Sequence, residues 1–279
     1  MNWKTKVILI FGILSLIGII SLFELGYICI LEEKPTNYDL KYNFNKGDYF
    51  IYEILYSTEI PKNTIRATIH IETVVSDISE DNISMNVTST STADGNKTKS
   101  YNMTLTTHGK IIKSDFNGQI IPEIQLEFPN MLFYPENEIQ KDESWSASFA
   151  KEGNFTSEGM PVGYDVSGTK RYTCLGSKIV SVKAGNFDCV GIKCDANFTL
   201  NETIETANGT VYTTTTSETS GENWIDLRGG FLVKSTYDVN KIIKMDLSEV
   251  YKKTGFGVFY RETPINYQTV SELLERRKV

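Results

Sequence analysis

Hydrophobic residues follow two different patterns in this sequence, one at the start of the chain and one along the rest of it. The first is an apolar run over Val7–Phe23, which Glu24 interrupts and Leu25–Leu31 continues. The second is an alternation of apolar and polar residues that begins near Asp48 and is typical of strands with one buried face. The sequence therefore predicts a membrane helix followed by a domain made mainly of β-strands.

The apolar run is long enough to be a membrane anchor. A helix over Val7–Phe23 would span about 25 Å, which is most of the hydrocarbon core of a bilayer. Lys4 and Lys6 precede the run and Glu32 follows it, so the N-terminus is expected in the cytoplasm. The alternative is a cleaved signal peptide, whose apolar core is usually about 7–15 residues long and is followed by small residues. No such small-residue pattern follows here.

Four segments follow from these patterns. We expect residues 1–33 to be a cytoplasmic stub and transmembrane signal-anchor, with the membrane contact through residues 7–31. Residues 34–46 are expected to be a linker, residues 47–262 an extracytoplasmic β domain, and residues 263–279 a C-terminal helical tail. The protein would then sit in the cell membrane as a single-pass protein with its main domain outside.

The strand predictions rest on alternation and on turn residues between the alternating stretches. In Thr64–Val75, for example, Ala67, Ile69 and Ile71 fall on one face. Asn208 and Gly209 mark a two-residue hairpin turn. By the same reasoning, strands are predicted over Asp48–Ser57, Asn82–Thr90, Lys99–Thr107, Lys110–Asp115, Ser144–Phe149, Tyr164–Leu175, Lys178–Lys183, Phe187–Leu200, Thr203–Thr206, Thr210–Thr219, Asn223–Asp226, Phe231–Asp238 and Ile242–Leu247.

The end of the chain has a helical pattern instead. Thr269 and Glu272 have the spacing of a capping box, in which each side chain caps a backbone amide of the first helical turn. Leu273 and Leu274 then fall on one helical face with Val270. We therefore predict a short helix over Val270–Lys278 that docks on its own domain or on a partner.

Composition and charge narrow the choice of function. Hydrophobic residues make up 40% and aromatic residues 11% of the 279 residues, which is enough for a packed core. The formal net charge is -7, and no basic face offsets it, so nucleic acid is not an expected partner.

Potential glycosylation sites agree with an extracytoplasmic domain. N-glycans are added outside the cytoplasm to asparagine in the pattern Asn-x-Ser/Thr. Accidental sequons in Asn- and Thr-rich strands are the alternative. The eight candidate sites are Asn82, Asn86, Asn96, Asn102, Asn154, Asn197, Asn201 and Asn208.

Three cysteines lie in the predicted domain, and an oxidising compartment would favour one disulfide among them. We expect Cys174 to pair with Cys189, because Cys174 lies just before a predicted hairpin formed by Lys178–Lys183 and Phe187–Lys193. Cys189 and Cys194 are an odd number of residues apart and would face opposite sides of a strand, so they are not expected to pair with each other. A metal site is the alternative, but the chain has two histidines and no C-x-x-C motif. We expect neither a metal nor a cofactor.

Common catalytic motifs are missing from the sequence. It contains no G-x-S-x-G elbow, no phosphate-binding loop and no H-E-x-x-H motif. His70 and His108 lie in a strand and beside a turn glycine, and we expect both to be structural or exposed. No catalytic residue is assigned, although a pair of carboxylates remains an alternative that the sequence leaves open.

Four short motifs occur in an order that resembles a known group of exported proteins. The chain is similar to the curved-sheet proteins related to the lipoprotein-carrier (LolA/LolB-like) superfamily. The resemblance implies an antiparallel, strongly curved sheet or incomplete barrel, and some members of that superfamily carry acyl chains on the concave face. The motifs are Phe44–Tyr52, Pro135 with Asp142–Trp145, Cys174–Gly176 with Val180–Cys189, and Trp224–Asp226 with Gly230–Ser235.

Three functions agree with these observations. The first is a noncatalytic domain that binds an apolar or lipid-like ligand, because an open curved sheet leaves an apolar face to be covered. The second is a structural or interaction glycoprotein that contacts other envelope proteins, and the third is a carboxylate-dependent hydrolase. For the first function, the candidate lip of the groove is the apolar cluster Phe128, Met131, Leu132, Phe133 and Tyr134, for which core packing is the alternative.

Overall fold

The fold is described from a computed structural model, which describes residues 37–60, 63–93, 95–114, 132–157, 159–253 and 257–278. These residues all belong to one compact unit, Thr36–Val279. The predicted signal-anchor, residues 1–33, lies outside them. No helix in these described ranges is long and apolar enough to cross a membrane.

The described residues form one large antiparallel sheet and a small one. The large sheet has eleven strands in the order β6-β5-β4-β3-β2-β13-β12-β11-β10-β9-β8, and β1 pairs with β7 in the small sheet. One short helix, α2, is described as well. The bounds are β1 Asn37–Tyr38, β2 Tyr49–Ile60, β3 Asn63–Ser79, β4 Asn82–Ser91, β5 Lys97–Thr106, β6 Ile111–Ser114, β7 Ile139–Gln140, β8 Ser144–Ser157, β9 Met160–Val182, β10 Gly185–Thr206, β11 Gly209–Asp226, β12 Leu232–Asp246, α2 Ser248–Lys253 and β13 Tyr260–Arg277.

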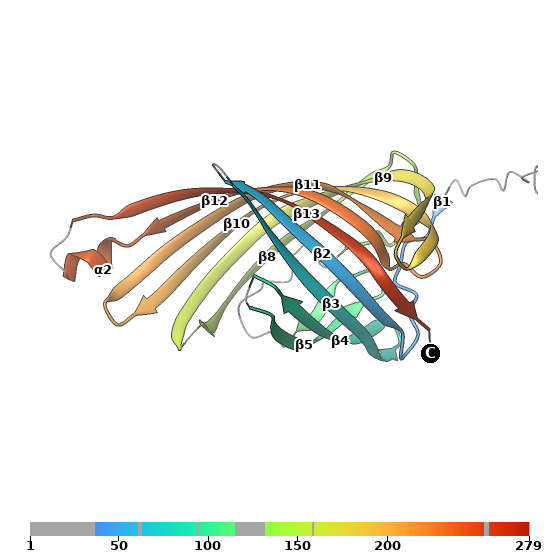
Figure 1. The fold of residues 1–279 in the computed structure, drawn as a ribbon, viewed down its shortest axis with the longest axis horizontal. Coiled ribbons are helices and arrows are strands. Elements are labelled where there is room, and N and C mark those ends of the chain that lie inside the picture. Colours follow the sequence, from blue (N-terminus) through green and yellow to red (C-terminus); the bar gives the residue numbers. More distant parts are fainter. Residues whose placement is uncertain are drawn as a thin grey trace, which may run out of the picture. The chain divides into compact units, whose positions relative to one another are not determined.

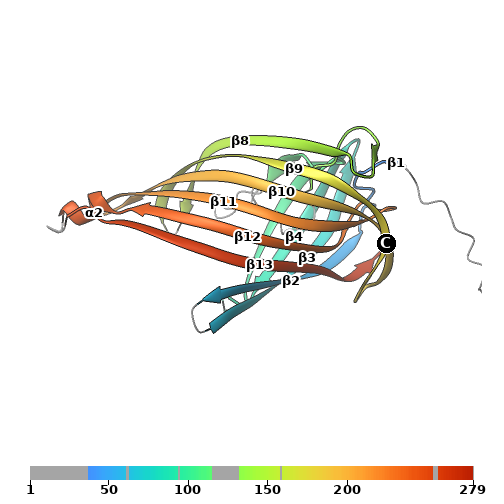
Figure 2. The ribbon, with the colours of Figure 1, turned by 90° about the horizontal axis from the view of Figure 1, so that it is seen from above.

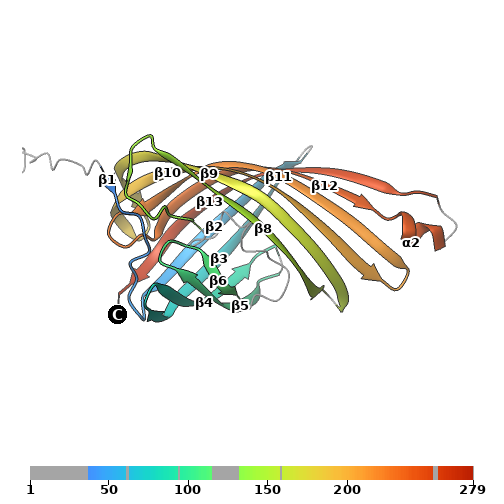
Figure 3. The ribbon, with the colours of Figure 1, turned by 180° about the vertical axis from the view of Figure 1, so that it is seen from behind.

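The large sheet is strongly curved. Strands β9–β12 form an arch, and β3–β5 lie beneath it (Figures 1 and 3). Seen from above, β8–β13 run alongside one another while β2–β4 turn away from them at a steep angle (Figure 2). Side chains from both halves, such as Ile71 of β3 and Tyr172 of β9, belong to one buried cluster on the concave side. The expected fold class, a mainly β and strongly curved antiparallel sheet, is confirmed.

Several predicted strands join into longer ones. The predicted strands Phe187–Leu200 and Thr203–Thr206 are both part of β10, which pairs with β9 and β11 along its length. The predicted hairpin is present, with Thr206 of β10 opposite Gly209 of β11. Local alternation predicts such strands well, because each residue's face follows from its neighbours.

The C-terminal prediction is wrong, because Val270–Lys278 lies mostly in strand β13 and not in a helix. β13 pairs with β12 on one side and with β2 on the other. Thr269 and Leu273 point into the core, and Leu273 is fully buried. The capping-box pattern is a weak local preference, and two ladders of hydrogen bonds with distant strands outweigh it.

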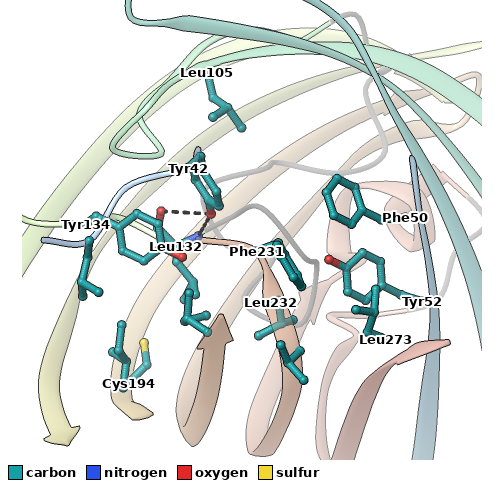
Figure 4. Close-up of a cluster of buried hydrophobic side chains, with 14 of the residues drawn as sticks. Tyr42, Phe50, Tyr52, Leu105, Leu132, Tyr134, Cys194, Phe231, Leu232 and Leu273 are labelled. Carbon is teal, nitrogen blue, oxygen red and sulfur yellow. Dashed lines mark hydrogen bonds between the residues drawn. The ribbon is translucent and has the colours of Figure 1, made fainter. Parts of the chain in front are cut away.

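The stretch predicted as a linker contributes to the core from Asn37 onward. Its alternate side chains are buried against the inner face of the sheet: Tyr38, Leu40, Tyr42 and Phe44. The Tyr42 hydroxyl accepts a hydrogen bond from the Leu132 backbone N–H at 3.3 Å, and Tyr42 lies beside Tyr134 (Figure 4). Burial raises the pKa of the Tyr42 hydroxyl well above its ordinary value.

The predicted disulfide is also wrong. Cys174, Cys189 and Cys194 are all free and buried. Cys174 lies opposite Ile192, whereas Cys189 lies opposite Lys178. Ile192, the residue opposite Cys174, is three residues from Cys189 along β10. The two cysteines are therefore roughly 10 Å apart along the strand direction, beyond the reach of a disulfide. Burial instead raises the pKa of both the Cys189 and Cys194 thiols to about 12.

Candidate functional site

The concave face of the sheet consists of rows of side chains that run across its strands. The register defines these rows, because residues directly opposite on neighbouring strands share a face. One row begins with Trp145, whose ring stacks on Tyr172 at 5.2 Å. The members of this row, from β8 to β3, are Trp145, Tyr172, Cys194, Gly221, Tyr237, Thr269, Tyr56 and Ala67.

Close packing in this row depends on a glycine at position 221. A Cβ atom at Gly221 would lie 2.2 Å from the ring of Tyr237, so the ring occupies the space that a side chain would need. The Tyr237 hydroxyl accepts a hydrogen bond from the Asn223 amide. The row therefore combines aromatic packing with buried polar groups.

An apolar hollow lies at the β3 end of this row. Its volume is about 320 Å³, near the lower end of the range of roughly 300–1,000 Å³ for small-molecule sites. Tyr56 and Tyr267 lie with their ring centroids 5.9 Å apart. The described lining residues are Tyr56, Thr58, Ala67, Ile69, Ser91, Ala93, Ile265 and Tyr267.

Four strands contribute to the lining of this hollow: β2, β3, β4 and β13. Tyr56 of β2 lies opposite Ala67 of β3, and the small alanine leaves the space open. Ile265 and Tyr267 come from β13, two residues apart and hence on the same face. Sequence alternation placed Ala67 and Ile69 on one face. It missed Ile265 and Tyr267, because the chain beyond residue 262 was taken as helical.

A cation lies beside the hollow. The Lys241 ammonium is 5.1 Å from the centroid of the Tyr267 ring, within the range of a cation–π contact. Lys241 lies opposite Ile265 of the hollow. An apolar surface with a cation next to it suits a ligand that has an apolar body and a polar or acidic end.

Buried hydroxyl groups continue from the hollow into the core. Thr269 lies opposite Tyr56, and Ser271 follows on the same face of β13, opposite Ser235. Within the described chain, the side-chain oxygens of Thr269, Ser271 and Ser235 have no hydrogen-bond partner. Buried polar atoms normally have partners, so these three oxygens are exceptions within the described chain.

The predicted lip of the groove is part of the core where it is described. Leu132 and Tyr134, which Figure 4 shows among the buried side chains, are 4% and 5% exposed. The Tyr134 hydroxyl donates to the Gly230 carbonyl at 2.8 Å. Phe133 is partly buried, and its carbonyl accepts a hydrogen bond from the Trp145 indole N–H at 2.9 Å. Phe128 and Met131 lie outside the described residues.

A second, larger hollow of about 760 Å³ lies on the opposite, outward face of the sheet. Most of its lining residues have polar side chains, among them Asn197, Glu218 and Asn240, which form an outward row on β10, β11 and β12. It lacks the continuous apolar lining of the hollow at Tyr56. We therefore take the smaller, apolar hollow as the candidate site.

The candidate glycosylation sites are mostly accessible. Of the eight asparagines, Asn82 is half-buried and the other seven are exposed. The side-chain oxygen of Asn197 accepts a hydrogen bond from the Thr169 hydroxyl at 2.7 Å, and that of Asn201 accepts one from Thr214 at 2.9 Å. Both contacts leave the amide nitrogen, the atom that carries an N-glycan, uninvolved. Modification itself remains a prediction.

The described part of the chain contains no group of three or more His, Cys, Asp or Glu residues that could hold a metal ion. Burial raises the pKa of the Glu202 carboxyl. Its neighbours across the sheet are Tyr164 and Thr213, so no second carboxylate faces it there. A carboxylate-dependent hydrolase needs two such acids within roughly 5–10 Å.

Solved structures that are similar to this chain include the following two. One is a proposed exported protein of Bacteroides fragilis with a YmcC-like fold: it is 11% identical, has a TM-score of 0.38, and is matched over 86% of this chain and 99% of its own. The other is a proposed lipoprotein of Parabacteroides distasonis: it is 9% identical, has a TM-score of 0.34, and is matched over 86% of this chain and 100% of its own. Neither description names a catalytic activity. No protein-family model and no curated protein matches the sequence.

Proposed function

We propose that the curved domain is a noncatalytic binding module that holds an apolar ligand on its concave face. The observation that carries the proposal is the apolar hollow lined by Tyr56 and Tyr267, which opens on the inner face of the sheet. The neighbouring Lys241 and the buried hydroxyls of Thr269 and Ser271 favour a ligand with a polar end. Lipid-like molecules have this combination of properties.

If the ligand binds in this hollow, a side chain that fills the hollow should weaken binding. In Ala67→Phe, a ring replaces a methyl group that faces Tyr56. We expect this variant to bind a neutral apolar dye, N-phenyl-1-naphthylamine, at least about tenfold more weakly than the unmodified domain, a loss of about 1.4 kcal/mol or more. The measurement is fluorescence titration of residues 34–279, together with native mass spectrometry and organic extraction of co-purified molecules.

The matched control for this variant is Thr68→Phe. It adds the same ring at the next position of β3, which faces the other side of the sheet. We expect the control to bind the dye as the unmodified domain does. Equal binding by all three proteins, with no co-purified apolar molecule, would remove the basis of the proposal.

A second candidate is a membrane-tethered surface glycoprotein that contacts other envelope proteins. The exposure of seven of the eight sequon asparagines favours it. In this proposal residues 7–31 anchor the chain in the membrane, and the β domain lies outside the cytoplasm. We expect mass spectrometry of the protein from its native source to find glycan on exposed sites such as Asn86 and Asn197. Unmodified asparagine at every site would count against this candidate.

A further inference from the structure

A polar hollow of about 410 Å³ lies where the N-terminal segment approaches the end of the last strand. It is separate from the apolar hollow, and the proposed function does not use it. In Figure 1, β1 and the C-terminal end of β13 lie toward the same end of the sheet. The described lining residues are Asn43, Asn45, Asn186, Phe187, Asp188, Asp226, Arg228, Gly229, Arg276 and Lys278.

Arg276 is the central cation of this hollow. Its guanidinium lies over the ring of Phe231 at 4.2 Å and near that of Phe50 at 5.9 Å. These aromatic rings hold the guanidinium in place, because a planar cation stacks favourably on an aromatic face. The neighbouring Phe231 and Phe50 side chains are both fully buried, so this support is rigid (Figure 4).

The guanidinium retains unused hydrogen-bonding capacity. Its Nε atom is buried and has no hydrogen-bond partner among the described residues. No described carboxylate lies within ion-pair distance of Arg276, in contrast to Arg277, which pairs with Glu275. An arginine normally directs its N–H groups at acceptors, so these donors are available to a ligand.

The charges around the hollow favour an anion. Three cations line it, Arg228, Arg276 and Lys278, against two carboxylates, Asp188 and Asp226. Asp226 is already engaged, because one carboxylate oxygen accepts hydrogen bonds from the backbone N–H groups of Arg228 at 3.2 Å and Gly229 at 2.7 Å. Asp188 faces the hollow as a second acidic group and restricts how an anion is oriented.

An amide donor adds to this set. The side-chain oxygen of Asn186 accepts a hydrogen bond from the Ser181 hydroxyl at 2.6 Å, which leaves its amide N–H groups as donors. Guanidinium, ammonium and amide groups together match the acceptor oxygens of a carboxylate or phosphate.

We propose that this hollow is a binding site for a small ligand that bears an oxyanion, a carboxylate or a phosphate, with Arg276 as its principal contact. This polar site is separate from the apolar hollow, and a ligand can bind at either site without the other.

The test is a thermal-unfolding titration of the full chain in a nonionic detergent, with inorganic phosphate and acetate as separate probes at constant ionic strength. Binding to the folded state raises Tm as the probe concentration increases. We expect a saturable rise with at least one probe. A response to phosphate alone identifies a phosphate site, and a response to acetate identifies a carboxylate site.

Variants of the lining residues test whether the rise in Tm comes from binding in this hollow. Arg276→Gln is expected to raise the probe concentration that gives half of the full Tm increase at least about tenfold, because the variant loses a charge-assisted contact. Arg261→Gln, at an exposed position on the same strand, is the matched control and should leave the titration unchanged. If Arg276→Gln does not fold, Lys278→Gln, at an exposed position, should weaken the response several-fold. No saturable rise with either probe, or an equal rise in the hollow variants, would overturn the proposal.

Discussion

Replacing Gly230 by alanine is expected to lower the free energy of unfolding by about 3–5 kcal/mol. Gly230 has a φ of 67°, and a Cβ atom there would lie 1.9 Å from the carbonyl oxygen of Lys41. The backbone has little freedom to move away. The Gly230 carbonyl accepts a hydrogen bond from Tyr134, and its N–H donates to the Asp226 carbonyl at 2.9 Å.

The loss at Gly230 has two causes, the left-handed backbone conformation and the clash of the Cβ atom with Lys41. The variant Gly95→Ala separates them. Gly95 has nearly the same φ, 68°, but no atom lies within 4 Å of the position of its Cβ. Only the cost of the left-handed backbone remains, about 1–2 kcal/mol. Urea unfolding of both variants, followed by circular dichroism, measures the difference. Equal losses would mean that the contact with Lys41 is not tight.

Truncating Phe231 to alanine is expected to cost about 3–5 kcal/mol, the usual range for a fully buried phenylalanine. The Phe231 ring is 5.4 Å from the ring of Phe50 and meets Phe187 edge-on at 5.7 Å. It is fully buried, so truncation leaves a cavity that the strands on either side cannot close. The loss also removes the support beneath Arg276.

Phe259→Ala is the matched control for this truncation. Phe259 is 41% exposed, and its described ring contact is with Tyr251 at 4.9 Å. We expect this change to cost under about 1 kcal/mol, because little apolar surface returns to water. Chemical unfolding of both variants provides the comparison. A similar loss at the two positions would argue against Phe231 as a core residue.

Local patterns in the sequence predicted the strands. The structure at the C-terminus and the positions of the cysteines depend on pairing between strands that are far apart in the sequence. The alternation in β3 and β4 follows from sequence neighbours alone, so these strands were predicted nearly as they are. The end of the chain was misassigned because a capping box is visible in sequence, whereas the position between β2 and β12 is not. The disulfide prediction failed for a related reason: it needed the offset between β9 and β10, which the sequence does not display.

The candidate site was only partly predictable. Ala67 and Ile69 were placed on one face, but Tyr267 and Ile265 face them from a strand that is about 200 residues further along the chain. The predicted lip at Leu132 and Tyr134 has the apolar composition of a binding surface. Composition does not distinguish such a surface from a core, and the Tyr134 hydrogen bond to Gly230 shows that this tyrosine serves the core.

The position of β13 has a consequence for how the protein is made. β13 comes after all the other strands of this sheet in the sequence, yet it lies in the middle of the sheet, between β2 and β12. Until its 18 residues leave the ribosome, strands β2–β6 and β8–β12 each keep an open edge with unpaired backbone groups. Such edges are prone to pair with other chains, and pairings between distant segments form slowly. The nascent chain would therefore benefit from a chaperone that covers these edges until β13 has been synthesised.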